Sequence, residues 1–238
     1  MLPATPAPPA IELRDVRFGW SPGRALLEVA EFSVARGERV FLNGPSGSGK
    51  STLLGLVGGV FEPQGGAIRL LGQDLGALTR SGRDRFRAAH LGYVFQLFNL
   101  VPYLSVLDNV LLPLRFSLER RRRVAAPRAA AMRLLQALGL DDPELVARRV
   151  TQLSVGQQQR VAAARALLGQ PDILIADEPP SSLDTDARKN FLDLLMRECA
   201  AAGTTLLFVS HDQSLGACFD RSVSLSDINR SARRKDAA

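Results

Sequence analysis

Residues 44–51 read GPSGSGKS, and this stretch decides the fold. It fills the four fixed places of the phosphate-binding pattern G-x-x-x-x-G-K-[S/T] with Gly44, Gly49, Lys50 and Ser51. Because glycine permits tight turns, consecutive amide N–H groups of such a loop can surround an anion. We expect an apolar strand before the loop, at 39–43, and a helix after it, at 52–57, whose N-terminal end would face the same phosphates. A Gly/Ser-rich surface turn is the weaker interpretation.

The composition is that of a globular protein. The chain has 238 residues, and 46% of them are hydrophobic, which suffices for a substantial core. No apolar run approaches the roughly 20 residues that a bilayer span needs, and the N-terminal sequence does not have the pattern of a signal peptide. We therefore expect a cytoplasmic protein. Cys199 and Cys218 show neither metal-type spacing nor a disulfide framework, and we assign both to packing.

The chain is basic, with a formal net charge of +6, which would fit a nucleic acid or an anionic membrane surface. Much of the excess lies in two places, the run at 120–123 and the basic residues of 230–235. Charge runs of this kind are more often solvated faces or disordered ends than binding patches. We favour the solvated interpretation.

Hydrophobic periodicity predicts the class of fold. Strands with alternating or continuous apolar residues are expected at 11–18, 26–34, 67–71, 91–95, 173–176 and 205–209, the first two forming an antiparallel edge. Helical patterns cover 105–112, 127–138, 156–168 and 184–202. The pattern predicts an α/β core with an antiparallel β edge and a helical insertion between its two halves.

Polar side chains follow the predicted buried strands. Asp177 and Glu178 come directly after the apolar run 173–176, where open α/β sheets bind their ligands. Asp177 would hold Mg²⁺ and Glu178 could polarise an attacking water, while the Ser51 hydroxyl would offer a second ligand for Mg²⁺. His211 follows the strand at 205–209, and contact with a γ-phosphate or a structural role are equally good interpretations from its position.

The ordered motifs resemble those of one family. The set comprises GPSGSGKS (44–51), Gln96, LSVGQQQR (153–160), ILIADEP (173–179), SLD (182–184) and His211, and it resembles the nucleotide-binding subunit of ATP-binding cassette (ABC) transporters. The resemblance covers 11–228, which it implies to be a single ABC ATPase domain. The fold class that it implies is α/β, a P-loop NTPase (RecA-like) core with an antiparallel β edge subdomain and an inserted α-helical subdomain. Within it, 11–96 and 165–228 would form the catalytic core and 97–164 the helical subdomain, with 1–10 and 229–238 as flexible tails.

The resemblance also implies residue roles. Trp20 is similar to the aromatic residue that stacks on adenine, although tyrosine is more usual there and local packing explains such a residue equally well. Gln96 resembles the glutamine that reaches the Mg²⁺ and attacking-water region and senses the membrane partner. Glu178 resembles the catalytic carboxylate and His211 the switch histidine on the γ-phosphate. The catalytic residues it implies are Glu178, His211 and Gln96, and the Mg²⁺ ligands are Ser51, Gln96 and Asp177.

The signature motif of the family binds the γ-phosphate of an ATP held by the opposite subunit, and Ser154, Gly156 and Gln157 resemble it. Asp184 resembles the residue that closes the D-loop, which communicates across the dimer. The residues implied to bind ATP are Trp20, Gly44, Pro45, Ser46, Gly47, Ser48, Gly49, Lys50, Ser51, Thr52, Ser154, Gly156, Gln157 and Asp184.

Two positions depart from the family pattern. Val155 replaces the first glycine of the usual LSGGQ, which would weaken the closed dimer if the backbone there needed a positive φ, and would cost nothing if valine fits the start of the helix. Pro180 stands where threonine or serine is usual and would stiffen the turn. An active ATPase is still expected, because every chemical group is retained.

The stretch YVFQLFNLVPYLSVLDNVLLPL (93–114) looks most like the branch of lipoprotein-releasing and macrolide-exporter ATPases. The resemblance implies a homodimer around two Mg-ATP that drives an integral membrane permease from the cytoplasmic face of the membrane, with nucleic acid an unlikely partner. Two alternatives stay open: a regulatory ABC ATPase of a non-transporting membrane complex, and a soluble ABC ATPase that acts on nucleic acid or the ribosome.

Overall fold

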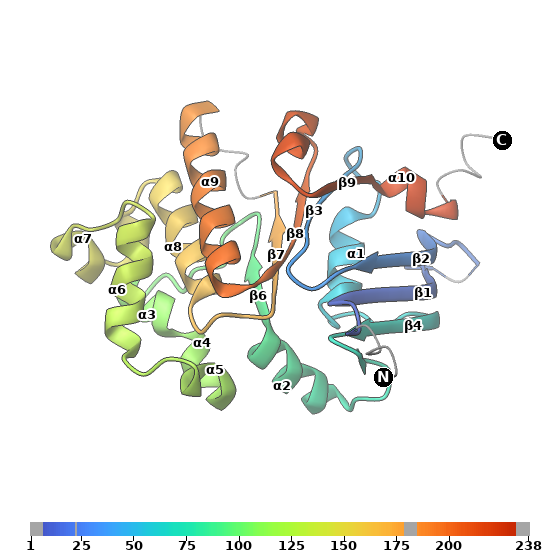
Figure 1. Ribbon diagram of the computed structural model, residues 1–238, viewed down its shortest axis with the longest axis horizontal. Coiled ribbons are helices and arrows are strands. Elements are labelled where there is room, and N and C mark those ends of the chain that lie inside the picture. Colours follow the sequence, from blue (N-terminus) through green and yellow to red (C-terminus); the bar gives the residue numbers. More distant parts are fainter. Residues whose placement is uncertain (1–6, 22, 179–184, 232–238) are drawn as a thin grey trace, which may run out of the picture. The chain divides into compact units, whose positions relative to one another are not determined.

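The structure is a computed structural model that describes residues 7–21, 23–178 and 185–231, and it divides the chain into two compact units (Figure 1). Residues 1–83 and 211–238 make the first unit, and residues 84–210 make the second. The division falls inside helix α2 (Arg80–His90) and again after Ser210. The second unit is therefore inserted between the two sequence segments of the first.

An antiparallel sheet forms one part of the first unit, with strands in the order β2-β1-β4-β5. Leu13 of β1 lies opposite Phe32 of β2 on one side and Ile68 of β4 on the other, and all three are buried. The antiparallel edge expected from the sequence is thus present, and Figure 1 shows β2, β1 and β4 side by side. The strands are β1 (Ile11–Phe18), β2 (Leu27–Val34), β4 (Gly65–Leu70) and β5 (Gln73–Asp74).

The strand before the phosphate loop is β3 (Arg39–Asn43), whose three central side chains are fully buried. It pairs in parallel with β9 (Arg221–Ser224), and the loop then leads into helix α1 (Lys50–Val57). Strand β3 ends at Asn43, directly before Gly44, the first glycine of the phosphate loop. A 3₁₀ helix (Gln213–Cys218) precedes β9, and α10 (Leu225–Ile228) follows it.

Residues near both expected tails are packed into the first unit. Ala10 is fully buried, and its N–H donates to the Val34 carbonyl at 2.8 Å. The side chain of Asn229 is buried, accepts from the Glu28 N–H at 2.9 Å and donates to the Leu26 carbonyl at 3.0 Å. Ala10 and Asn229 therefore belong to the folded unit, because their polar groups complete the backbone bonding of β2.

Parallel strands form the centre of the second unit, in the order β6-β7-β8. Every residue of β7 and β8 is buried, as expected for strands that are covered on both faces. Helix α9 (Thr185–Ala202) lies between these two strands in the sequence and is followed by Gly203, which has a φ of +64°. The strands are β6 (Leu91–Val94), β7 (Ile173–Asp177) and β8 (Thr205–Ser210).

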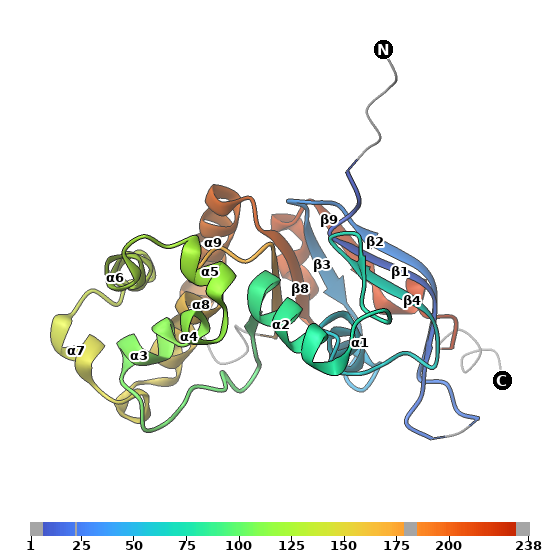
Figure 2. The same ribbon diagram turned by 90° about the horizontal axis from the view of Figure 1, so that it is seen from below.

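Helices fill the chain between β6 and β7, as the sequence predicts. In α8 the alanine-rich run at 161–164 is fully buried, and small side chains there let α3 and α6 lie against it (Figures 1 and 2). These elements are α3 (Val106–Leu111), α4 (Pro113–Phe116), α5 (Leu118–Arg122), α6 (Pro127–Ala137), α7 (Pro143–Ala147), a 3₁₀ helix (Val150–Gln152) and α8 (Val155–Leu167).

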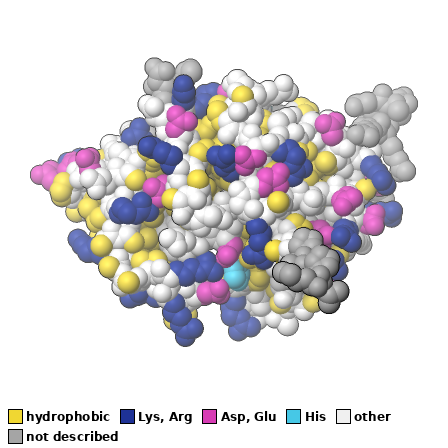
Figure 3. Space-filling model, in the orientation of Figure 1, with side chains coloured by type: hydrophobic (Ala, Val, Ile, Leu, Met, Phe, Trp, Pro, Cys, Tyr) yellow, Lys and Arg dark blue, Asp and Glu magenta, His cyan; other side chains and the backbone are white. Residues whose placement is uncertain are grey.

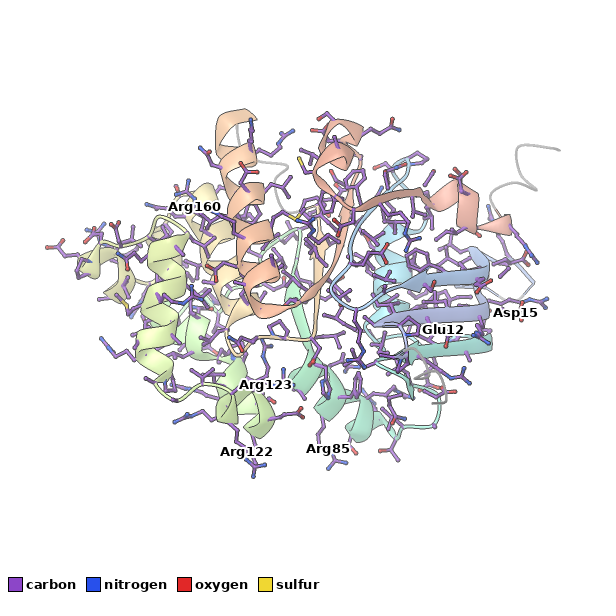
Figure 4. The ribbon with its side chains drawn as sticks, viewed as in Figure 1. Glu12, Asp15, Arg85, Arg122, Arg123 and Arg160 are labelled. Carbon is purple, nitrogen blue, oxygen red and sulfur yellow. The ribbon has the colours of Figure 1, made fainter. Side chains whose placement is uncertain are left out.

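The arginine run at 120–123 is not the solvated face that the sequence suggests. Arg120 is only 3% exposed, and its guanidinium donates to the carbonyl oxygens of Ala166 at 2.7 Å and Leu168 at 2.5 Å. Burial lowers the pKa of Arg120 to about 10. Arg122, in contrast, extends outward from α5 (Figure 4). Arg120 therefore has a structural role, because its guanidinium donates hydrogen bonds to backbone carbonyls at the end of α8.

Basic and acidic side chains occur together on one face of the protein. On the face drawn in Figure 3, Lys and Arg side chains are scattered among Asp and Glu. Over the described ranges 7–21, 23–178 and 185–231, no helix is both long and apolar enough to cross a membrane. Cys199 is buried on α9, as expected, whereas Cys218 is exposed, so the packing role assigned to Cys218 is wrong.

Candidate nucleotide-binding site

The phosphate loop of the first unit adopts a backbone that needs glycine. Gly47 has a φ of +75° and Gly49 a φ of +104°, a region that side chains rarely allow. A Cβ atom on Gly49 would also lie 3.1 Å from the Leu27 Cδ2 atom of the neighbouring strand. Gly49 is the N-cap of α1, so the loop turns directly into the first helical turn.

Lys50 is buried beneath this loop, with 6% of its surface exposed. Its Nζ donates to the carbonyl oxygens of Gly44 at 2.9 Å and Pro45 at 3.1 Å. A buried ammonium is costly unless it is hydrogen-bonded, so these two carbonyls fix its place. The backbone of the phosphate loop therefore positions the Lys50 ammonium.

The start of α1 fits an anion with several oxygen atoms. The first turn carries no acidic side chain and no side-chain cap, so its amide dipoles are not offset by a negative charge. The Ser48 hydroxyl is buried and has no hydrogen-bond partner among the described residues. Ser51 is exposed and Thr52 is half-buried. These donors match the oxygen-rich surface of a nucleotide phosphate.

Trp20 is both packed and exposed. Its ring meets the rings of Phe18 and Phe61 edge-on, with 5.1 Å between centroids in each pair. The indole is nevertheless 64% exposed, so a face remains for another planar group. Contacts with Phe18 and Phe61 thus explain why the indole ring lies here, and its stacking on adenine stays a proposal.

The carboxylates of the second unit lie at the end of β7. Asp177 is 9% exposed and lies opposite Val209 of β8. Glu178 has a φ of +47°, and its N–H donates to the Val209 carbonyl at 2.9 Å. In a continuing strand, successive side chains point to opposite faces, and this left-handed residue interrupts that alternation. Such strain is common at functional sites and persists where neighbours hold it.

Gln96 belongs to the same edge of the sheet. In the β6–β7 register Val94 lies opposite Ala176, so Gln96 and Glu178 each lie two residues beyond this pair. Gln96 is exposed. Burial raises the pKa of Tyr93 in β6, and the negative charge of Asp177 raises it further. The second unit thus brings Gln96, Asp177 and Glu178 to one edge.

The signature residues form the start of α8. Ser154 is its N-cap and Gln157 its third residue, and they make a capping box in which each side chain bonds the other's backbone. Val155 is the first helical residue, is 51% exposed, and is not among the residues with positive φ. Of the two outcomes expected for Val155, the structure supports the second, in which valine fits the start of the helix.

The two histidines have different surroundings. His90 Nδ1 and Asp172 Oδ2 are 2.8 Å apart in a hydrogen bond, so His90 has a structural place in the second unit. His211 is exposed directly after β8. Asp184 and Pro180 lie outside the described residues.

The predicted site residues are divided between the two units. The first contains Trp20, the loop 44–52 and His211, and the second contains Gln96, Asp177, Glu178 and the signature residues. Sequence reasoning missed a hollow of about 230 Å³ beside Gln96, lined by Phe95, Asn99 and Phe116 among others. The sequence does contain a signal for this hollow, since large apolar residues such as Phe95 and Phe116 line it.

Comparison with known proteins places the chain in a family. The sequence model of the ABC transporter family matches residues 27–181. The chain is 42% identical to the lipoprotein-releasing system ATP-binding protein LolD of Anaeromyxobacter dehalogenans over 226 residues, 93% of this chain and 92% of the relative. It is 41% identical to the uncharacterized ABC transporter ATP-binding protein YbbA of Escherichia coli K12, over 92% of this chain and 96% of that one.

A solved structure agrees. The dimeric post-hydrolysis state of the ATP-binding cassette MJ0796, bound to ADP and Pi, superposes with a TM-score of 0.81 and 31% identity over 93% of this chain and 95% of that chain. The predicted fold class is confirmed by this similarity, since both share the parallel P-loop sheet, the antiparallel β subdomain and the helical subdomain. The chain therefore belongs to the ABC transporter family, in which it is an ATP-binding subunit that hydrolyses ATP.

Proposed function

We propose that two copies of this chain close around two Mg-ATP molecules and thereby drive a separate membrane permease. The observation that carries the proposal is the buried Lys50, whose ammonium is fixed by two loop carbonyls ahead of an uncapped helix start. Residues 44–52 would hold the phosphates and Trp20 would stack on adenine. Because phosphoryl transfer depends mainly on positioning and charge neutralisation, a preformed loop of this kind is well suited to it.

The residues that we assign to Mg²⁺ have the chemistry that this ion prefers. Ser51, Gln96 and Asp177 all offer oxygen atoms, which suits a small, hard cation. The ion would neutralise charge on the β- and γ-phosphates. Glu178 would polarise the attacking water and His211 would hold the γ-phosphate. The left-handed backbone of Glu178 supports a functional role, because strain of this kind needs a reason to persist.

We assign the signature residues to the nucleotide of the partner copy. Ser154, Gly156 and Gln157 would bind the γ-phosphate of that ATP, and Asp184 would communicate across the interface. The capping box occupies the N–H groups of Ser154 and Gln157, and by position the two amides between them have no intrahelical acceptor. That leaves donors for an anion at the start of α8. The relative MJ0796 forms dimers, which supports the same arrangement here.

The domain limits are part of the proposal. The region 11–228 would act as a single ABC ATPase domain, with 11–96 and 165–228 as its catalytic core. The helical subdomain would be 97–164, the segment that carries α3 to α7 and the first turns of α8. The chain would work at the cytoplasmic face of the membrane, held there by the permease.

A contact surface for the permease lies in the second unit. Phe116 lines the hollow next to Gln96 and is 71% exposed, and Leu97, between two other lining residues, is 83% exposed. Large apolar side chains at the rim of a hollow are typical of protein contact sites. Because Gln96 lies in the same turn, a permease segment seated there could sense and set its position.

We propose an exporter as the permease and a lipoprotein or a macrolide-like compound as the cargo. The stretch 93–114 supports this branch, and the lipoprotein-releasing LolD is a relative over nearly its whole length. A nucleic acid is disfavoured as the partner, since the basic side chains are scattered among acidic ones on the face in Figure 3.

The test is recovery of the permease. The tagged chain, purified from detergent-solubilised membranes, should bring down a multi-span membrane protein. A Leu97→Asp variant should lose this protein and keep its own ATPase rate within about twofold, because an exposed side chain contributes little to folding. Nuclease-sensitive recovery of nucleic acid without a membrane protein would overturn the proposal.

The matched control is Leu118→Asp, which alters a side chain that is 77% exposed on α5 and does not line the hollow. This variant should still recover the membrane protein. Equal loss with both variants would show that the hollow is not the contact surface.

A further inference from the structure

Arg165, near the end of α8, is bound to the turn that follows β6. Its Nη1 donates to the Asn99 carbonyl and its Nη2 to the Phe98 carbonyl, each at 2.6 Å. The planar guanidinium suits two neighbouring acceptors, and charged donors give the stronger hydrogen bonds. The signature helix is thereby joined to the segment that carries Gln96.

The two acceptor residues have an unusual backbone. Phe98 has a φ of +60° and Asn99 a φ of +47°, two consecutive non-glycine residues in the left-handed region. A single residue of this kind costs about 1 kcal/mol or more, so the pair needs external support. Within the turn, the Phe98 N–H donates to the Phe95 carbonyl at 3.0 Å. The Asn99 N–H donates to the Leu97 carbonyl at 2.6 Å. Arg165 adds two hydrogen bonds from another element, α8.

Arg165 is itself held in a restricted place. It lines the hollow beside Gln96 and is half-buried, and burial lowers the pKa of its guanidinium. A charge that is partly removed from water is stabilised by the carbonyls that it meets. Movement of the guanidinium away from this turn would therefore break two charge-assisted hydrogen bonds.

Asn109 holds the other end of the same segment. It is fully buried, its Oδ1 accepts from the Val101 N–H at 2.8 Å, and its Nδ2 donates to the Val101 carbonyl at 3.1 Å. Residues 98–101 are thus held at two points, by α8 and by α3. The exposed residues Gln96 and Leu97 lie between this segment and β6.

We propose that Arg165 is a positioning residue that fixes Gln96 through the turn at 98–99 and so transmits displacements of α8 to the hydrolytic site. Since Ser154 caps the start of α8, contact of the signature residues with a nucleotide would move the same helix that holds this turn. The inference rests on the proposed role of Gln96 in hydrolysis. It assigns Arg165 no contact with ATP.

The matched pair of variants is Arg165→Lys and Arg120→Lys. Both arginines are buried or half-buried and donate to backbone carbonyls, but the acceptors of Arg120 lie outside the turn at 96–99. Lysine keeps the charge and loses the two-pronged geometry. Arg165→Lys should lower kcat about tenfold with KM for ATP within about twofold, since small displacements of a reacting group slow the chemical step. Arg120→Lys should lower Tm and leave kcat within about twofold.

A double-mutant cycle with Gln96→Ala tests whether Arg165 acts through Gln96. If Arg165 acts through Gln96, the double variant Gln96→Ala/Arg165→Lys should be no slower than Gln96→Ala alone, because coupled residues are not additive. Independent losses that multiply would overturn the inference.

A spectroscopic measurement does not depend on activity. A nitroxide attached to Leu97→Cys in a Cys218→Ser background reports the mobility of the turn, because Cys199 is buried and Leu97 is exposed. Arg165→Lys should sharpen the spectrum, and Arg120→Lys should not. An unchanged spectrum in Arg165→Lys would overturn the inference. A sharpened spectrum together with an unchanged kcat in Gln96→Ala would support the anchor and refute the role proposed for Gln96.

Discussion

Ser154 and Gln157 exchange hydrogen bonds across the first turn of α8: the Gln157 N–H donates to Ser154 Oγ at 3.3 Å, and the Ser154 N–H donates to Gln157 Oε1 at 2.9 Å. The two side chains therefore stabilise the start of α8 in the absence of nucleotide. A change at Ser154 combines a cost in stability with a cost in function, and the two must be separated.

Ser154→Ala should lower the free energy of unfolding by about 1 kcal/mol, as loss of an N-cap does. If Ser154 also binds the partner's γ-phosphate, this variant should lose ATP-dependent dimerisation, measured by light scattering with Mg-ATP. Ser105→Ala is the control, because Ser105 caps α3 by accepting from the Asp108 N–H at 3.0 Å and has no assigned role in binding. It should lose similar stability and still dimerise; failure of both would leave a folding defect as the explanation.

Val155→Gly restores the usual family sequence and should bring no gain. Val155 begins α8 without a positive φ, so its backbone does not call for glycine. We expect an ATPase rate within about twofold of the parent, and a loss of about 0.5 kcal/mol in stability because glycine is a poor helix former. A several-fold rise in the rate would indicate that valine hinders closure.

Lys50→Ala should weaken ATP binding by about tenfold or more, because it removes a charged donor from the phosphate loop. Calorimetric titration with ATP measures this effect directly. Lys189→Ala provides the matched control, since Lys189 is exposed on α9. Equal affinities in the two variants would contradict the assignment of residues 44–51.

Glu178→Gln should bind ATP normally and hydrolyse it about 100-fold more slowly or worse, as expected when a group that activates water is removed. The left-handed backbone at this position should persist, since glutamine differs only in its terminal group. Phosphate release measures the rate, and fluorescent ATP measures binding. Glu144→Gln, an exposed acid on α7, should match the parent.

Asp172 links stability to pH. Burial raises the pKa of its carboxyl, but the hydrogen bond with His90 and the charge of Arg123 outweigh this and hold the pKa below its ordinary value of 3.8. A carboxylate whose pKa falls on folding stabilises the protein above its unfolded pKa, and the contribution is lost as the pH falls through the folded pKa. Asp172→Asn should therefore cost about 1 kcal/mol at pH 7, and the difference should shrink below pH 3.8 in urea titrations.

The control for this titration is Asp193→Asn, which alters an exposed carboxylate on α9. Its unfolding free energy should follow the parent at every pH. A constant difference between parent and Asp172→Asn down to pH 3 would contradict the linkage.

Much of the fold follows from apolar periodicity, and the exceptions have physical reasons. The first strand has the predicted bounds, Ile11–Phe18, because alternate residues are buried. Helix α2 (Arg80–His90) was not predicted, since Ala89 is its only buried residue and its sequence shows little apolar pattern. Arg120 was assigned to a solvated run because nothing local distinguishes it from its neighbours. Its hydrogen bonds to carbonyls of β6 and of the end of α8, both distant in the sequence, make it a core residue.

In the candidate site, too, some features can be predicted from the sequence and others cannot. Motif spacing predicts which residues surround the phosphates, because loop glycines and a helix start are local properties. The positive φ of Glu178 depends on a hydrogen bond to Val209, a residue of another strand, so it cannot be inferred from neighbouring residues. Arg165 was missed for a similar reason: its acceptors, Phe98 and Asn99, are far away in sequence.

The position of Asn229 has a consequence for synthesis on the ribosome. Its side chain bonds the backbone of Leu26 and Glu28, about 200 residues earlier, and β3 likewise pairs with β9. The inserted unit at 84–210 can therefore be complete in the nascent chain before the unit that began first. Until residues 221–229 emerge, the strand that leads into the phosphate loop lacks its β9 neighbour. The phosphate loop is thus translated early, and the strand before it gains its β9 neighbour only after residues 221–224 have been synthesised.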